Sequence, residues 1–280
     1  GDRESLCFQA GLMAMNSWQA ALKIRELSLR LVHNARASHI GSALSIADLL
    51  AVMVTDPEVL YLPGPNYPDR DRLLLSKGHA CVSFYAALYL KGFYSLESLF
   101  TYGDDYSIFM NHVSHHVPGV ELSTGALGHA LPIACGKALA AKLTKQSWHV
   151  VVIMSDGELQ EGSNWEAMLF ANHHRLDNLS ICIDFNNLQS LTTTDQTINL
   201  RPLSEKLKAF GWAVKEVDGH DHGQLRNALV SSKHESLPSA LILNTVKGKG
   251  VSFMEGSVAW HYRSPSDEEL QLALQELGVQ

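Results

Sequence analysis

The second half of the chain alternates short strand-like runs with stretches of helical spacing, and this alternation constrains the fold more than any other feature. The strand-like runs lie at 149–155, 180–186, 213–218 and 239–246, and the helical stretches between them lie at 164–174, 203–210 and 224–233. Most of these runs are short and apolar throughout, which is typical of strands buried on both faces. The alternation therefore predicts an α/β fold, a parallel sheet flanked by helices on both faces.

The first half adds helices and one more strand to this plan. Helical spacing occurs at 17–33, 45–54 and 81–90, an alanine-rich helix is expected within 122–143, and a last amphipathic helix covers 266–277. A short apolar run before residue 76 reads as a further strand. Because no repeat or low-complexity linker interrupts the pattern, we expect one domain over residues 16–280. Residues 1–15 lack the basic start and apolar core of a signal peptide, and we expect a disordered end or a tag remnant.

Composition excludes several classes of protein. Apolar residues make up 46% of the 280 residues, enough for a large core, and the net charge is −7. Without a block of Lys and Arg, no nucleic-acid partner is expected. No apolar run reaches the roughly 18 residues of a membrane span. The four cysteines are scattered without a CxxC pair, which favours free thiols in a reducing, cytoplasmic compartment.

Polar clusters follow two successive strands of the predicted sheet. Asp156 comes directly after one strand, and Asn186 follows the next strand 30 positions later. Ligands of parallel sheets bind at the carboxyl ends of strands, so this carboxylate and this amide oxygen could converge on Mg²⁺. Gly157 would let the backbone approach a phosphate at a helix N-terminus. Ordinary turns and helix caps explain the same residues, and spacing alone leaves both interpretations open.

Several motifs together extend this interpretation. The stretch DGELQEGSNWEA…DFNN resembles the thiamine diphosphate motif, with Ser155 where that motif usually has its first glycine. The segments ASHIGSALSIADLLAVM, LSKGHA, HVPGVELSTGALGHALPIACGKALA and TVKGKGVSFMEGSVAWH occur in the order found in transketolases. From about Asn16 to its end, the chain is thus similar to the transketolase family. The resemblance implies the thiamin diphosphate-binding fold, and within it the domain that binds the diphosphate.

The resemblance also implies roles for individual residues. Mg²⁺ or Ca²⁺ would be held by Asp156, Asn186 and the main-chain carbonyl of Leu188. The expected contacts to thiamine diphosphate are His79, Gly125, Leu127, Gly128, Asp156, Gly157, Glu158, Asn186, Lys247 and His261. Lys247 stands in a Lys/Gly-rich turn, 247–250, which would otherwise read as a solvated loop. Glu161 and Glu166 resemble acidic residues that line a subunit interface.

Four histidines are the expected catalytic residues: His39, His79, His112 and His261. Histidine has an ordinary pKa near neutrality, which suits proton movements on sugar hydroxyls and on a developing alkoxide. We assign His39 and His261 to that work and His79 and His112 to substrate orientation. The match for His112 is open, because His115 and His116 compete with it for the same position in the motif.

The implied activity is that of a transketolase, as the N-terminal subunit of a two-component enzyme. Such an enzyme moves a two-carbon ketol unit from a ketose to an aldose through a carbanion adduct of the cofactor. The chain ends at Gln280, and the glutamate that activates the pyrimidine is expected on a partner subunit with pyrimidine-binding and C-terminal domains. Two copies of each would form a heterotetramer, inactive without the partner. The last helix suggests a natural end, and a truncated full-length enzyme is the alternative.

Other functions remain open from the sequence. A deoxyxylulose-phosphate-synthase-like or dehydrogenase-type thiamine enzyme would carry a similar acidic-Gly to Asn motif. A non-catalytic binding subunit could keep the same fold as a relic. The sugar is also undecided: ordinary pentose phosphates are the default, and branched or sulfonated sugars are the alternatives.

Overall fold

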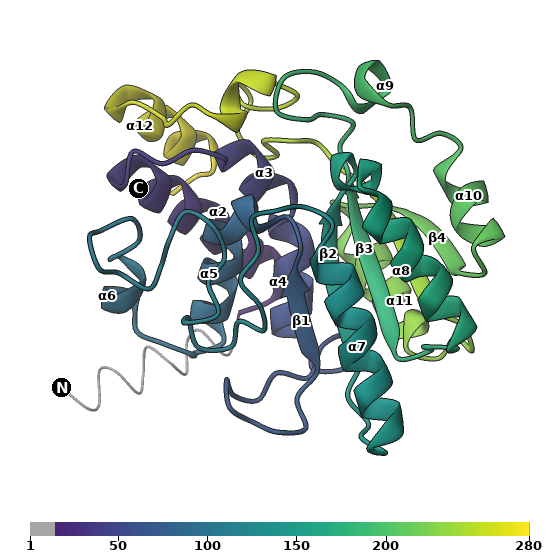
Figure 1. Ribbon diagram of the computed structural model, residues 1–280. Coiled ribbons are helices and arrows are strands. Elements are labelled where there is room, and N and C mark those ends of the chain that lie inside the picture. The colour runs from purple at the N-terminus through teal and green to yellow at the C-terminus, as the bar shows by residue number, and fades with distance from the viewer. Residues whose placement is uncertain (1–14, 280) are drawn as a thin grey trace.

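Five parallel strands form the sheet at the centre of the molecule (Figure 1). A computed structural model describes residues 15–279, so the expectation for residues 1–14 lies outside the described residues. The strands are β1 (Arg72–Leu75), β2 (Val150–Ser155), β3 (Leu179–Phe185), β4 (Ala213–Asp218) and β5 (Ser239–Asn244). They lie in the order β1-β2-β3-β5-β4, and every neighbouring pair is parallel. The predicted parallel sheet is confirmed.

Helices cover both faces of this sheet, as predicted. One face carries α2 (Ser17–Asn34), α3 (Ile40–Ser45), α4 (Ala47–Thr55), α5 (Cys81–Leu90), α11 (His222–Ser232) and α12 (Asp267–Glu276). The other carries α7 (Ala130–Leu143), α8 (Gly162–His173) and α10 (Leu203–Ala209). Successive side chains of β2 point to opposite faces, so Val151 and Ile153 join the first core and Val152 and Met154 the second. This two-sided burial explains why the strand is apolar at every position before Ser155.

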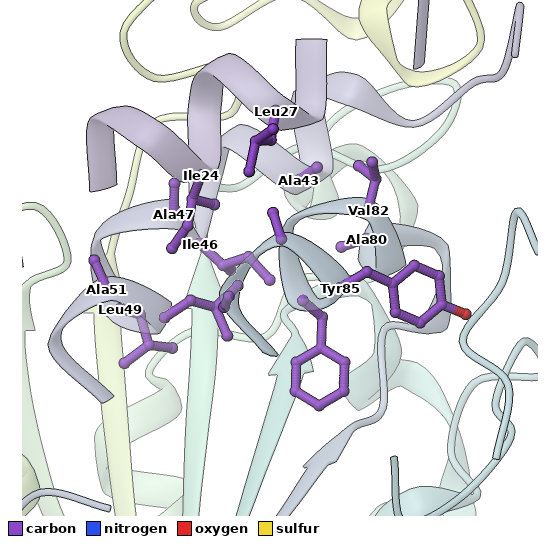
Figure 2. Close-up of a cluster of buried hydrophobic side chains, with 14 of the residues drawn as sticks. Ile24, Leu27, Ala43, Ile46, Ala47, Leu49, Ala51, Ala80, Val82 and Tyr85 are labelled. Atoms are coloured by element: carbon purple, nitrogen blue, oxygen red, sulfur yellow. The ribbon is translucent and has the colours of Figure 1, made fainter. Parts of the chain in front are cut away.

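The first core is built largely from neighbouring helices, as Figure 2 shows. Ile24 and Leu27 of α2 pack with α3, α4 and α5, and every residue of α5 is buried. Tyr85 of α5 lies in this cluster, and its hydroxyl donates to the carbonyl of His112 and accepts the Ser114 N–H (3.1 and 3.0 Å). The packed core thus holds a loop whose residues reach the sheet's carboxyl edge.

Helix boundaries follow local sequence signals. The helix α2 begins at an Asn16 capping box and α12 at a Ser266 capping box, which satisfy backbone N–H groups at both N-termini. In Figure 1, α12 (yellow) packs beside α2 (purple). The alanine-rich helix lies within the expected 122–143 and begins at Ala130. The segment between the first two predicted helices contains a further short helix, α3.

Short helices fill the remaining connections: η1 (Gly78–Ala80), α6 (Leu96–Leu99), η2 (Gly157–Gln160), α9 (Thr194–Thr197) and η3 (Val258–His261). Three of them, η1, η2 and η3, follow the carboxyl ends of strands β1, β2 and β5. Within residues 15–279, no helix is both long and apolar enough to span a bilayer.

Candidate functional site

A cavity of about 370 Å³ opens at the carboxyl end of the sheet, where ligands of parallel α/β folds bind. Its lining is His39, Ser42, Lys77, His79, His112, Gly125, Leu127, Ser155, Asp156, Gly157, Gln160, Glu161, Asn186, Leu188, Gln189, Ser190, Lys247, His261 and Tyr262. Segments more than 200 residues apart in sequence meet here. Apart from Gly128 and Glu158, every residue that the sequence nominated as catalytic, cofactor-binding or metal-binding lines this one cavity.

Four histidines form a group on one side of the cavity. The ring of His39 lies 5.3 Å from that of His79, 5.6 Å from that of His112 and 4.9 Å from that of His261, centre to centre. The rings of His79 and His261 are 5.5 Å apart. His115 and His116 do not line the cavity, so the geometry singles out His112 among the three competing positions.

The pKa values of these histidines are lower than the near-neutral values expected of them. Burial, together with His112 and Lys247, lowers the pKa of His39 to about 4. Burial and Lys247 lower the pKa of His261 to about 3, and burial and Lys77 hold the pKa of His79 well below its usual range. The imidazoles are therefore neutral at physiological pH, and each offers one N–H donor and one nitrogen acceptor.

His39 is held in an unusual backbone conformation. Its φ is 72°, in the left-handed region that non-glycine residues seldom occupy, and it immediately precedes α3. Its N–H donates to the carbonyl of His261 at 2.8 Å, which ties α3 to η3. Its Nδ1 is buried without a hydrogen-bond partner in the described part of the chain. A buried polar nitrogen needs a partner, and a group bound in the cavity could supply one.

The two predicted strand ends do meet on the acidic side of the cavity. Ser155 of β2 pairs with Asp184 of β3, so the residues that follow each strand are adjacent. The carboxylate of Asp156 accepts the N–H groups of Gly157 (2.7 Å) and Asn187 (2.5 Å). Burial and the charge of Asp184 raise the pKa of Asp156 to about 7. A cation beside this carboxylate would favour its ionised form.

Asn186 and Leu188 complete the predicted cation-binding set. The Asn186 amide donates to Asp184 at 3.0 Å and accepts the Leu188 N–H at 3.0 Å, which fixes which end of the amide is oxygen. Asp156, Asn186 and Leu188 all face the cavity. One carboxylate, one amide oxygen and one carbonyl suit Mg²⁺ or Ca²⁺, which share their remaining positions with water and phosphate.

A buried ion pair that the sequence reasoning missed lies beneath the cavity. The ammonium of Lys77 pairs with Asp184, and both side chains are almost fully buried. Asp184 also accepts from the hydroxyls of Ser45 (2.6 Å) and Thr245. Burial raises the pKa of Asp184, but Lys77 and these hydrogen bonds outweigh it and keep the pKa below its usual value. The position of Lys77 two residues before His79 could have indicated this role.

Lys247 is a second buried cation, from the loop after β5. Its ammonium donates to the carbonyl of Gln189 (3.1 Å) and lies 3.0 Å from Nδ1 of His261. Within residues 15–279 no carboxylate forms an ion pair with it, and burial and Lys77 lower its pKa to about 8. Lys249, by contrast, pairs with Glu255 outside the cavity. Only the first part of the 247–250 turn faces the cavity.

These features fit a diphosphate with a divalent cation. Lys77 and Lys247 supply positive charge, and Gly157 lets the side chain of Gln189 approach the start of η2, where an added Cβ would meet it at 2.9 Å. The Nε2 of Gln189 is buried without a partner among residues 15–279, as is Nδ1 of His39. Anions favour such N–H groups and helix N-termini, and the carboxylate of Asp156 favours a cation beside them.

Glu158 and Gly128 lie behind the cavity instead of lining it. The Glu158 carboxylate is buried, accepts the N–H groups of Gly128 (2.9 Å) and Ser155 (3.3 Å), and bonds the Ser76 hydroxyl. Gly128 has a φ of +82°, and a Cβ there would lie 2.7 Å from Glu161. The Glu158 carboxylate thus supports the loop that ends at Gly128 from behind the cavity, and the cofactor contacts expected of these two residues stay predictions.

Comparison with known proteins agrees with this geometry. Residues 17–280 match the family "Transketolase, thiamine diphosphate binding domain". One subunit of the apulose-4-phosphate transketolase of Phocaeicola vulgatus is 39% identical over 91% of this chain and 92% of its own length. A 6-deoxy-6-sulfo-D-fructose transketolase subunit of a Clostridium species is 38% identical over 91% and 93%.

Longer transketolases match over part of their length. Human transketolase is 33% identical, and the match covers 93% of this chain but 42% of the human protein. The crystal structure of Campylobacter jejuni transketolase superposes with a TM-score of 0.88 and 31% identity, over 95% of this chain and 43% of that one. The fold, the cavity and these matches lead to one conclusion: the chain belongs to the transketolase family and forms its thiamine diphosphate-binding domain.

Proposed function

We propose that this protein is the cofactor-binding subunit of a two-component transketolase, which transfers a two-carbon ketol unit from a ketose to an aldose. The observation that carries the proposal is the single cavity in which Asp156, Asn186, two buried lysines and four histidines converge. When bound, thiamine diphosphate supplies a carbon nucleophile and an electron sink for the two-carbon fragment. The remaining work of binding, orientation and proton movement falls to the residues of the protein.

The acidic and the basic side of the cavity have separate tasks. Asp156, Asn186 and the Leu188 carbonyl hold Mg²⁺ or Ca²⁺, and Lys247 and Gly157 hold the diphosphate. Lys77 neutralises Asp184 and so leaves Asp156 as the carboxylate available to the cation. Gly125 and Leu127 line the same cavity, and we assign them to lie alongside the cofactor.

The histidines act on the sugar. We assign proton acceptance at sugar hydroxyls to His39, whose Nδ1 has no partner among residues 15–279, and proton donation to the developing alkoxide to the Nε2–H of His261. His79 and His112 are assigned to orient the donor by hydrogen bonds. Lowered pKa values keep the rings of His39, His79 and His261 neutral, so each ring carries one N–H donor and one nitrogen with an electron pair. A bound diphosphate adds negative charge near these rings, which raises their pKa values toward the working pH.

A second subunit completes the site. The chain spans about 42% of the human enzyme, whereas it spans 92% of the Phocaeicola relative. We place the pyrimidine-activating carboxylate on a partner with pyrimidine-binding and C-terminal domains, in a complex of two copies of each. His112 and Tyr262 line the cavity and are exposed to solvent. This exposure supports the proposal that another chain covers the cavity.

The names of two relatives support a proposal for the substrate class. Their names specify apulose 4-phosphate and 6-deoxy-6-sulfo-D-fructose, a branched and a sulfonated sugar. We propose an anionic ketose donor, with pentose phosphate as the first candidate and these two as the alternatives.

A reducing cytoplasm suits the buried thiols of Cys81, Cys135 and Cys182, which form no disulfide and whose pKa values burial raises to about 12.

Calorimetry and a coupled assay test the proposal in two stages. Thiamine diphosphate should bind the purified chain with Mg²⁺ or Ca²⁺ and lose that binding with a chelator. With the partner present, the three donors should be compared for ketol transfer to an aldose. Cofactor binding without any transfer would indicate a non-catalytic role for this chain, and transfer by this chain alone would contradict the need for a partner.

A further inference from the structure

A buried charged cluster lies on the side of the 246–249 loop away from the cavity, and none of its members lines that cavity. It consists of Arg25, Asp48, His220 and His222, and is called here the Asp48 cluster. Asp48 of α4 is buried and accepts from Arg25 (2.9 and 2.5 Å), His220 (2.7 Å) and His222 (3.1 Å). Burial raises the pKa of Asp48, but these bonds hold it far below its usual value.

Two members of the cluster also bond the backbone on either side of Lys247. Nε2 of His220 accepts the N–H of Val246 at 2.8 Å. Nε of Arg25 donates to the carbonyl of Lys249 at 2.9 Å. Val246 and Lys249, on either side of Lys247, are therefore linked through His220 and Arg25 to one buried carboxylate, Asp48.

The hydrogen bonds of His220 define its tautomer. Because Nε2 accepts a main-chain N–H, its proton must be on Nδ1, which donates to Asp48. The carboxylate thereby selects the tautomer whose other nitrogen can hold Val246. His222 makes no such link: its second nitrogen bonds the Ser17 hydroxyl at 2.8 Å, at the start of α2.

The loop leaves Lys247 little freedom of its own. Gly248 has a φ of +83° and donates to the Gly41 carbonyl at 2.9 Å, and the Lys247 carbonyl accepts from Gly256 at 2.9 Å. A Cβ on Gly248 would lie 2.3 Å from the Met254 carbonyl. The backbone of Lys247 is thus held by these contacts and by the two bonds from the Asp48 cluster.

We propose that His220 and Arg25, oriented by Asp48, are positioning residues that hold Lys247 in the cofactor cavity. The significance of Lys247 for the cofactor rests on the proposed function, but the positioning itself does not. If the Asp48 cluster only stabilised the fold, loss of any one of its bonds would have a similar effect on Lys247. Positioning depends specifically on the bonds to Val246 and Lys249.

Two isosteric variants separate these roles. His220→Gln places an amide oxygen near the former Nε2, so it keeps an acceptor for Val246 and loses the bond to Asp48. His220→Asn places an amide N–H₂ near the former Nδ1, so it keeps the bond to Asp48 and loses Val246. His222→Asn is the matched control, because it removes one bond to Asp48 without touching the loop.

The measurement is the pKa of Lys247 itself, obtained from the pH dependence of its acylation in the full chain and read by peptide mass spectrometry. The buried amine starts from a pKa of about 8. In His220→Asn, loss of the bond to Val246 should let the Lys247 side chain reach solvent. The midpoint of its acylation should then rise by at least about one pH unit toward the ordinary lysine value. His222→Asn should retain the midpoint of the unmodified chain. His220→Gln, which keeps an acceptor for Val246 but loses its orientation by Asp48, should shift the midpoint less than His220→Asn does.

Several outcomes would overturn the proposal. One is an unchanged midpoint in folded His220→Asn, and another is an equal shift in His222→Asn or in His220→Gln. If His220→Asn does not fold, Arg25→Lys decides: it keeps a cation for Asp48 but loses the bond to Lys249, and an unshifted midpoint then refutes positioning. These measurements need no cofactor. Failure of thiamine diphosphate and Mg²⁺ to protect Lys247 would count against the proposed function alone.

Discussion

The ammonium of Lys247 lies 3.0 Å from Nδ1 of His261, and the two residues come from the loop after β5 and from η3. An ammonium group can only donate hydrogen bonds, so Nδ1 of His261 accepts and the ring proton resides on Nε2. Lys247 therefore does two things in the cavity: it supplies positive charge, and it fixes His261 as an Nε2–H donor. In histidines generally, the hydrogen bond made by one ring nitrogen sets the protonation of the other.

Replacing His261 should separate chemistry from cofactor binding. We expect His261→Ala to lower kcat of the complete enzyme by about 100-fold or more, the usual contribution of one acid–base group. The dissociation constant of thiamine diphosphate should change far less. His261→Gln should retain more activity, because its amide can donate from near the Nε2 position. Equal losses in turnover and in cofactor affinity would assign His261 to the diphosphate alone.

Asp156→Asn tests the cation site. The variant keeps the shape of the side chain and removes its charge, so the affinity for the cofactor in the presence of Mg²⁺ should fall by about 100-fold. Mutation of residues that only hydrogen-bond a metal ligand already lowers metal affinity by roughly 10–100-fold. Calorimetry at several Mg²⁺ concentrations measures the loss. Asp177→Asn, at a half-exposed carboxylate paired with Lys142 (2.6 Å), is the control and should bind normally. An Asp156→Asn protein that binds cofactor with unchanged Mg²⁺ dependence would place the cation elsewhere.

Gly78→Ala tests a close backbone approach beneath the histidines. A Cβ at Gly78 would lie 2.4 Å from the carbonyl oxygen of Thr124, so η1 and the loop that leads to Gly125 must separate. We expect a loss of about 1–3 kcal/mol in the free energy of unfolding, as for other overpacked sites. Urea unfolding measures it.

The control for this variant is a glycine with open space around it. Gly136 lies within α7 and has nothing within 4 Å of an added Cβ. Gly136→Ala should therefore stabilise the protein by about 0.5–1 kcal/mol through helix propensity. Similar effects of the two substitutions would show that the contact with Thr124 relaxes without cost.

His149 should make the protein sensitive to acid. It is buried at the start of the sheet, bonds Ser180 at 2.8 Å, and burial with Lys233 lowers its pKa to about 4, although Asp71 opposes this. The folded state thus binds fewer protons than the unfolded state between about pH 6.5 and 4. Stability is retained above that window and falls as the pH drops through it, by up to about 1.4 kcal/mol per pH unit.

His149→Gln measures this contribution. The amide can keep the bond to Ser180 and does not titrate, so the slope of unfolding free energy between about pH 6 and 4 should become shallower. At neutral pH the two proteins should have similar stability. Parallel slopes for the two proteins would mean that His149 does not govern the acid response.

The parallel sheet could be predicted from the order of residues, because strands buried on both faces must be apolar at nearly every position and the segments that connect them carry helical spacing. So could the approach of Asp156 and Asn186, since the carboxyl ends of neighbouring parallel strands share one edge. The order of five motifs indicated the family. These features depend on local periodicity and on short spacings, which a linear sequence displays directly.

The contacts of each polar residue could not be predicted in this way, because they depend on packing in three dimensions. Glu158 and Asp156 stand two positions apart, yet Asp156 faces the cavity and Glu158 turns away to support Gly128. Lys77 and Lys247 are 170 positions apart, and both are buried beside the same cavity. The pKa values of the histidines likewise depend on burial and on charges contributed by distant segments. Burial and long-range electrostatics arise from packing in three dimensions, which residue spacing along the chain does not specify.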